Sequence, residues 1–139
     1  MTTINWRRVV VAGLAAGLVA NGFDLLITVY LMASEFASMQ ARLDVTEEAA
    51  TAWIPLFAAT DFVWGILLVF TYAAIRPRFG PGPRTAVIGG MMLWLVVVIF
   101  AVVLVSLGLH TPQSFLKSSA LYLVSALVSS TVGAALYKE

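Results

Sequence analysis

Four long apolar runs with very few charges occupy most of this 139-residue chain. A helix rises about 1.5 Å per residue, so about 20 apolar residues are enough to cross about 30 Å of hydrocarbon. Each run is long enough to cross a bilayer once, and the runs cover residues 9–33, 50–75, 85–109 and 115–137. The sequence therefore predicts an all-α integral membrane protein, a four-helix up-down bundle in which residues 1–139 form a single transmembrane domain.

Composition excludes several classes of protein. Hydrophobic residues make up 61% of the chain and charged residues 11%, which is outside the range of a soluble domain. The absence of cysteine excludes disulfides, thiolate metal sites and thiol nucleophiles, and His110 is the only histidine. No catalytic triad order, phosphate-binding loop or basic nucleic-acid surface is present. We therefore expect no catalytic residues, no metal, no cofactor and no nucleic-acid partner, and we do not expect an enzyme.

Lysine and arginine are distributed unevenly between the two sides of the predicted bundle. Two of the eight, Arg42 and Lys117, lie on the side that also carries Glu35 and the acidic stretch 44–48. The other six are Arg7, Arg8, Arg76, Arg78, Arg84 and Lys138. Short cytoplasmic loops are enriched in Lys and Arg, so we expect both termini and the loop at residues 76–84 to be cytoplasmic. The arginines of this loop fix the topology and can also contact anionic lipid headgroups.

The loop at residues 34–49 is the only connection long enough to hold structure of its own. We expect a short interfacial helix there, with one apolar side formed by Phe36, Met39 and Leu43. Thr46 is a good N-cap for the second long helix, because its hydroxyl can accept a hydrogen bond from a free backbone N–H. Glu47 and Glu48 follow it and complement the positive end of that helix.

The loop between the second and third runs is the most distinctive stretch of the sequence. Residues 72–83 are YAAIRPRFGPGP, and the prolines and glycines predict a stiff turn that ends the second helix near Ile75. This stretch resembles a signature of a family of uncharacterised small four-helix bacterial membrane proteins. Members have a polar or acidic residue in the first helix and a tryptophan-glycine pair in the second. Asn21 with Asp24, and Trp64 with Gly65, are the corresponding residues here. The resemblance implies a protein of the bacterial inner membrane and supplies no activity.

Small and polar residues share one face of the first predicted helix. Gly13, Gly17, Asn21, Asp24 and Thr28 are spaced four, four, three and four residues apart. The glycine pair allows close approach of another helix, and the rest of the face is polar. A charged side chain in the middle of the bilayer costs about 2.5–3.5 kcal/mol even on an insertion scale. We therefore expect this face to contact protein.

The second helix carries an acid of its own, Asp61, on the face that also holds Gly65. Asp24 lies nine residues before the end of the first run, and Asp61 lies eleven residues after the start of the second. These offsets correspond to depths of about 13 and about 16 Å. We expect the two carboxyls to lie at similar depth on adjacent helices, where both cannot be charged at once.

The polar residues of the bundle have more than one interpretation. A structural interpretation is that neutral carboxyls form hydrogen bonds with Asn21, Thr28, Thr60 or Tyr122, at an average of about 0.6 kcal/mol each. A functional interpretation is a proton relay or cation site, because intramembrane acids are by default candidate sites. Binding of a hydrophobic cofactor, quinone or lipid is a third. Lys117 either extends to the headgroups or forms an inward salt bridge to one of the acids.

The fourth helix carries small residues on two adjacent faces, which suits close packing in a bundle with a partner. One row consists of Ser125, Ser129 and Gly133, and the other of Ala126, Ser130 and Ala134. Our first functional hypothesis is therefore a structural or accessory subunit of the bilayer that packs against itself, as a homo-oligomer, or against a larger membrane complex. The alternative is a proton-coupled transporter or cation pathway that uses Asp24 and Asp61.

Overall fold

The computed structural model describes residues 4–137, and this part of the chain is entirely helical apart from short connections. The elements are α1 (Trp6–Leu26), the π-helix η1 (Ile27–Leu31), α2 (Ala33–Arg42), α3 (Glu47–Thr51), α4 (Ile54–Phe79), α5 (Pro83–Ser106) and α6 (Pro112–Leu136). Four segments are long and apolar enough to cross a membrane, namely Trp6–Leu31, Glu47–Phe79, Pro83–Ser106 and Pro112–Leu136. The predicted class, all-α with four candidate spans, is confirmed.

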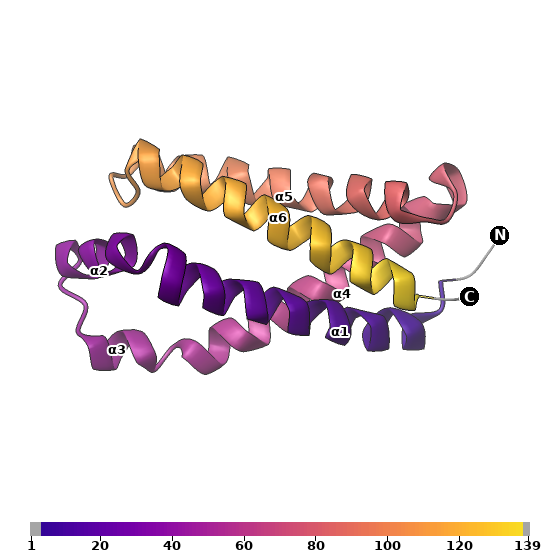
Figure 1. Cartoon of the computed structure of the whole chain (residues 1–139), viewed down its shortest axis with the longest axis horizontal. Coiled ribbons are helices and arrows are strands. Elements are labelled where there is room, and N and C mark those ends of the chain that lie inside the picture. Colours follow the sequence, from indigo (N-terminus) through magenta and orange to yellow (C-terminus); the bar gives the residue numbers. More distant parts are fainter. Residues whose placement is uncertain (1–3, 138–139) are drawn as a thin grey trace.

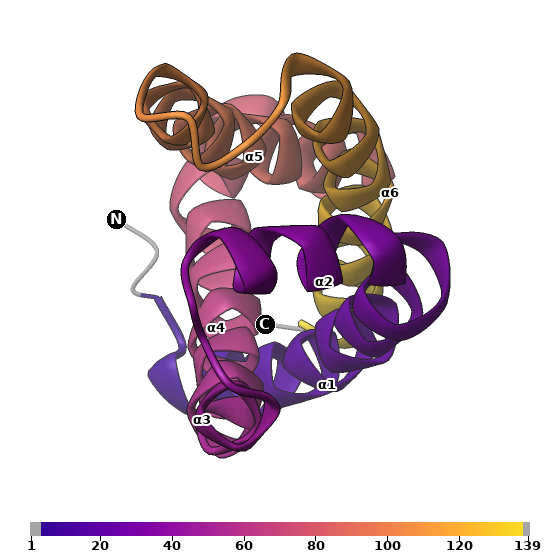
Figure 2. The ribbon, with the colours of Figure 1, turned by 90° about the vertical axis from the view of Figure 1, so that its left-hand side faces the viewer.

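The four long helices run alternately up and down. The start of α1, the end of α6 and the α4–α5 turn lie at one end of the bundle, which we call the terminal end (Figure 1). α2, α3 and the α5–α6 loop lie at the other, which we call the α2 end. The most extensive contacts join α1 to α4, and α6 packs on both α5 and α1. Seen from the α2 end, α1, α4, α5 and α6 form a ring, and α2 lies across it (Figure 2).

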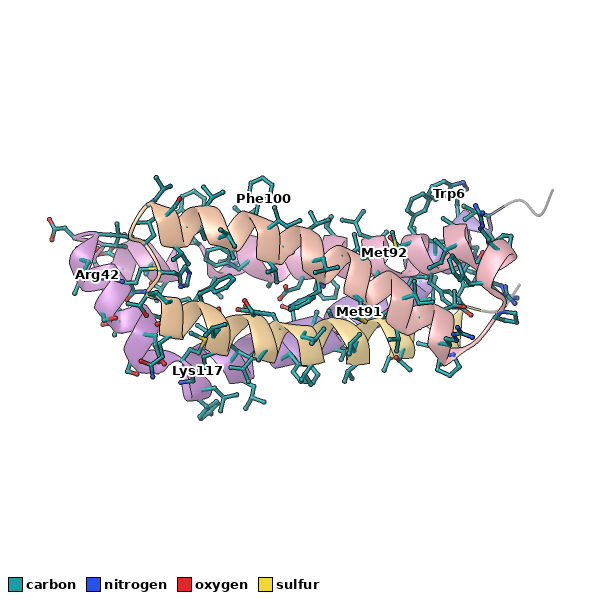
Figure 3. All side chains as sticks on the ribbon, turned by 90° about the horizontal axis from the view of Figure 1, so that it is seen from above. Trp6, Arg42, Met91, Met92, Phe100 and Lys117 are labelled. Atoms are coloured by element: carbon teal, nitrogen blue, oxygen red, sulfur yellow. The ribbon has the colours of Figure 1, made fainter. Side chains whose placement is uncertain are left out.

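The charged residues separate between these two ends. The five described arginines of the larger group lie at the terminal end, because they belong to the start of α1, the end of α4 and the start of α5. Arg42 and Lys117 lie at the α2 end, opposite Trp6 (Figure 3). Lys138, which we assigned to the larger group, lies outside the described residues.

Glycines set the closeness of the α1–α4 crossing. A Cβ atom on Gly13 would lie 2.6 Å from the Cα of Ile66, and one on Gly17 would lie 2.6 Å from the Cα of Phe62. A Cβ on Gly65 would collide with the backbone of both Gly13 and Gly17. Any side chain at these positions would force the two helices apart, so glycine is required on both sides of the crossing.

The small residues of α6 are used against the other helices of the same chain. A Cβ on Gly133 would lie 3.1 Å from the Cβ of Ala16 on α1 and would also contact Val69 on α4. On the neighbouring face, Ser130 Oγ donates a hydrogen bond of 2.7 Å to the carbonyl oxygen of Ala86 on α5. Ser125 and Ser129 are buried as well. Both small-residue faces of α6 are therefore covered within the monomer.

An aromatic cluster joins the helices at the terminal end. The hydroxyl of Tyr137 accepts a hydrogen bond of 3.3 Å from the backbone N–H of Asn5. Its ring meets the ring of Tyr72 edge-on, and the guanidinium of Arg76 lies 5.9 Å from the ring centroid. The hydroxyl of Tyr72 in turn accepts a 3.1 Å hydrogen bond from the N–H of Gly82. These contacts connect the start of α1, the end of α6 and the α4–α5 turn.

The ends of the helices differ from the sequence-based boundaries for identifiable reasons. α4 continues through Pro77 to Phe79, beyond the predicted end at Ile75, because a proline in the last turn removes only one backbone N–H. The helix stops at Gly80, which has a φ of 82°. At the other end of this span, Pro55 has no N–H to donate to an earlier carbonyl, and α3 and α4 are separate helices.

Candidate functional site

A cavity of about 260 Å³ lies among the four long helices, on the α2 side of the glycine crossing. Every long helix contributes to its wall. The lining residues are Ala20 and Asp24 from α1, Thr60, Asp61 and Trp64 from α4, Trp94 and Val97 from α5, and Tyr122 and Ser125 from α6. The cavity thus combines two carboxyls with three aromatic side chains inside the apolar part of the bundle.

The sequence of each helix explains why the cavity opens at this level. Towards the terminal end, Gly17 and Gly65 bring α1 and α4 into backbone contact, and Gly90 lies against the carbonyl of Ala126 in the α5–α6 pair. Towards the α2 end, large side chains line the cavity: Trp64 directly precedes Gly65 on α4, and Trp94 lies one turn after Gly90 on α5. The helices are therefore close together at one level and separated at the next.

Asp24 is held by a residue of another helix. The hydroxyl of Tyr122 on α6 donates a hydrogen bond of 2.8 Å to Oδ1 of Asp24. The sequence suggested Asn21, Thr28, Thr60 and Tyr122 as hydrogen-bond partners of the carboxyls. In the structure, Tyr122 is the one that bonds to Asp24.

Asp61 has a different environment. Its carboxyl lies close enough to Asp24 for the two to interact electrostatically. Within residues 4–137, however, the carboxyl of Asp61 accepts no hydrogen bond and forms no ion pair. One acid of the pair is therefore fixed by a donor, and the other presents its oxygens to the cavity.

Asn21 contributes to helix packing and does not line the cavity. Its Nδ2 donates to the carbonyl oxygen of Gly17 on its own helix at 3.1 Å and to that of Ala58 on α4 at 3.2 Å. Of the five residues that the sequence suggested as a polar site, Asp24, Asp61 and Tyr122 line the cavity. Asn21 and Thr28 are not among the lining residues, whereas Thr60 is.

Lys117 pairs with neither Asp24 nor Asp61. Its Nζ lies 2.7 Å from Oε1 of Glu35 on α2, and this hydrogen bond, together with one from Ser34, lowers the pKa of Glu35 to about 2. Arg42, at the other end of α2, donates to the carbonyl oxygens of Gly108 and Leu109 at 3.3 Å each. The short helix predicted in this loop is therefore present, and it is fastened to α6 and to the α5–α6 loop.

Two parts of this site were not found from the sequence. Trp94 and Val97 lie in a run that is uniformly apolar, and the only signal there was a single tryptophan among aliphatic residues. The π-helix Ile27–Leu31 was also missed. It begins three residues after Asp24 and contains Thr28, and π-helical turns are often found next to functional groups.

The donor set of the site is unsuited to a tightly bound metal ion. No group of three or more His, Cys, Asp or Glu side chains within the described part of the chain is arranged to hold one. Comparisons of the chain with family models, curated proteins and solved structures give no match.

Proposed function

We propose that the chain is a multi-pass protein of a bacterial inner membrane, with both termini cytoplasmic, that moves a cation in exchange for protons through the cavity at Asp24 and Asp61. One observation carries this proposal: two carboxyls from adjacent helices share a cavity in the apolar part of the bundle. No basic residue is found among the described residues that line it. An acid so placed must hold a proton or a cation, because a bare charge there is costly.

The unequal environments of the two carboxyls support exchange. Two interacting carboxyls in a medium of low dielectric constant act as a coupled pair and carry one negative charge more readily than two. Tyr122 stabilises Asp24 from α6, while Asp61 has no donor among the described residues. Asp61 is therefore the group that we assign to alternate between a proton and a cation.

Flux through reconstituted vesicles tests this proposal. The protein would be placed in liposomes that contain a pH-sensitive dye, and a cation gradient would then be imposed. We expect proton movement in the wild type and its loss in Asp61→Asn. The matched control is Asp44→Asn, an exposed acid whose φ of 53° asparagine tolerates well. Wild-type vesicles that behave like empty ones would refute the transport proposal.

A structural or accessory role is the second candidate, and the surface of α5 favours it. This helix exposes large apolar side chains along most of its length, among them Ile99 and Phe100, and Phe100 projects from the bundle in Figure 3. The small-residue faces of α6 already contact helices of this chain, so a partner would meet the bulky surface of α5. Purification in a mild detergent tests this role: a stable homo-oligomer or larger complex would support it, and a monomer would refute it.

A further inference from the structure

We infer that the ligand of this cavity is a monovalent organic cation with a compact apolar or aromatic body. Its charge is neutralised by Asp61, and its body contacts the indole rings of Trp64 and Trp94. This inference rests on the proposed function, because it names the class of cargo that the same site takes. It is carried by three properties of the wall: its charge, its hydrogen-bonding capacity and its size.

The wall is suited to a positive ligand. It carries two carboxyls, and its described residues include no Lys, Arg or His. Three of its donors already serve the chain itself. Tyr122 Oη donates to Asp24, Trp94 Nε1 donates to the carbonyl of Ser119 at 2.9 Å, and Thr60 Oγ1 donates to the carbonyl of Phe57 at 2.7 Å. An anion would find few donors here, whereas a cation finds the unoccupied oxygens of Asp61.

The size and lining of the cavity favour an organic cation over a metal ion. A water molecule occupies about 30 Å³ in the liquid, and the cavity measures about 260 Å³. A dehydrated calcium ion requires about six to eight oxygen ligands, whereas two carboxyls and few other oxygens are present. The space that the carboxyls leave is bounded by aromatic rings and by Ala20 and Val97, which suit a hydrocarbon body.

The indole rings add a second attraction for a cation. The face of a tryptophan ring binds ammonium groups through its quadrupole more strongly than tyrosine or phenylalanine does, within about 6 Å of the ring centroid. The ring of Trp94 is held in place by its hydrogen bond to α6, so it does not need to be ordered when a ligand arrives. Trp64 stands one helical turn after Asp61, so the same helix presents both the charge and a ring.

Binding and proton release are linked by charge balance. In the empty site, one carboxyl of the pair holds a proton. When an organic cation binds, the O–H bond of that carboxyl breaks, the proton leaves to solvent and the carboxylate pairs with the cation. One positive charge enters for each one that leaves, so the net charge of the site does not change.

The four tryptophans of the chain provide a direct binding assay. Replacing Trp6 and Trp53, which lie outside the cavity and are exposed, with phenylalanine leaves the two cavity tryptophans as the only source of tryptophan fluorescence. The full chain in detergent would be titrated with benzyltrimethylammonium and, separately, with its neutral isostere neopentylbenzene. We expect a saturable fluorescence change with the cation and none with the isostere. The converse variant, Trp64→Phe with Trp94→Phe, should show no such change.

Variants at the carboxyl test the same inference. Asp61→Asn should weaken benzyltrimethylammonium binding by about tenfold or more, and Asp61→Glu should largely restore it. Proton release into a weakly buffered solution should accompany binding in the wild type and be absent in Asp61→Asn. Unchanged elution in gel filtration and unchanged helix content would show that the variants are folded.

The outcomes separate this inference from the proposed function. An equal response to neopentylbenzene would overturn the inference and assign the cavity to a neutral apolar ligand. Undiminished binding of benzyltrimethylammonium by a folded Asp61→Asn variant would also overturn it, because Asp61 would then not neutralise the charge of the ligand. Proton-coupled flux of an inorganic cation in vesicles, without binding of benzyltrimethylammonium, would overturn the inference and leave the transport proposal intact. Binding without flux would overturn transport and support the ligand class.

Discussion

Tyr122 and Asp24, which lie 98 positions apart in the chain, are joined by a hydrogen bond of 2.8 Å between α6 and α1. This bond fixes one acid of the cavity and gives the pair its asymmetry, because Asp61 has no comparable donor within the described chain. It also connects the first and last long helices at the level where the bundle opens. The contact therefore has a structural consequence and, under the transport proposal, a functional one.

Replacing Tyr122 with phenylalanine separates these two consequences. Loss of the hydroxyl should lower the free energy of unfolding in detergent by only about 0.6 kcal/mol, the average for such bonds between membrane helices. Proton flux should fall clearly even though stability changes little, because Asp24 loses the donor that stabilises it. Thermal unfolding and vesicle flux, measured on the same preparation, check both expectations.

The control for this substitution is Tyr30→Phe, which removes the same atom from a side chain that is 73% exposed. It should change neither property. If Tyr122→Phe left flux untouched while lowering stability, the bond would be structural only, and the asymmetry of the carboxyl pair would have no part in transport.

The glycine crossing makes a prediction about stability alone. A methyl group at Gly65 would collide with the backbone of α1, so Gly65→Ala should destabilise the bundle by about 1–3 kcal/mol or prevent folding. The control is Gly22 on α1, where a Cβ atom would point into open space. Gly22→Ala should therefore be neutral or stabilising by up to about 1 kcal/mol. Thermal unfolding in one detergent compares the pair. Equal stability of the two variants would contradict the close approach of α1 and α4.

The ion pair at the α2 end predicts a dependence on pH. Hydrogen bonds from Lys117, which makes the largest contribution, and from Ser34 lower the pKa of Glu35 from 4.5 to about 2. A lowered carboxyl pKa stabilises the folded state above the unfolded pKa, and this contribution is lost as the pH falls towards 2. Attachment of α2 should therefore be constant from pH 7 to about pH 5 and weaken progressively below that range.

Hydrogen exchange of the α2 amides measures this attachment. Exchange should accelerate between pH 5 and pH 3 after correction for the intrinsic rate, and Lys117→Met should show fast exchange already at pH 7. Glu47→Gln removes an exposed acid at the same end of the bundle and serves as the control. Identical protection in wild type and Lys117→Met would show that the pair does not hold α2.

The class of fold and the acids of the site followed from local properties of the sequence. Long apolar runs define the spans, and counting residues placed Asp24 and Asp61 at comparable levels. The remaining features depend on three-dimensional relationships that spacing does not encode. Trp94 lines the cavity and donates its indole N–H to the carbonyl of Ser119 on α6, a contact between helices that their sequences do not specify. The small faces of α6 contact α1, α4 and α5, and their spacing alone does not distinguish these helices from an external partner.

Some local features could have been found with closer attention to backbone chemistry. Pro55 marks the break between α3 and α4, since it cannot donate to the carbonyl of Thr51. Gly80, and not Pro77, ends α4, because a proline in the last turn leaves most of the hydrogen bonds of that turn intact. The pairing of Lys117 with Glu35 needed the position of α2, which no periodicity specifies.

The orientation of the bundle can be measured because the chain has no cysteine of its own. Ala37 on α2 and Pro81 in the α4–α5 turn are exposed at opposite ends, so Ala37→Cys and Pro81→Cys report on the two sides separately. The arginines at the terminal end predict that this end is cytoplasmic. An impermeant maleimide added to intact cells should therefore label Ala37→Cys at once and label Pro81→Cys only after the membrane is permeabilised. The cysteine-free wild type gives the background. Labelling of Pro81→Cys in intact cells, with Ala37→Cys protected, would reverse the proposed orientation, and labelling of neither variant after permeabilisation would contradict the exposure of both ends.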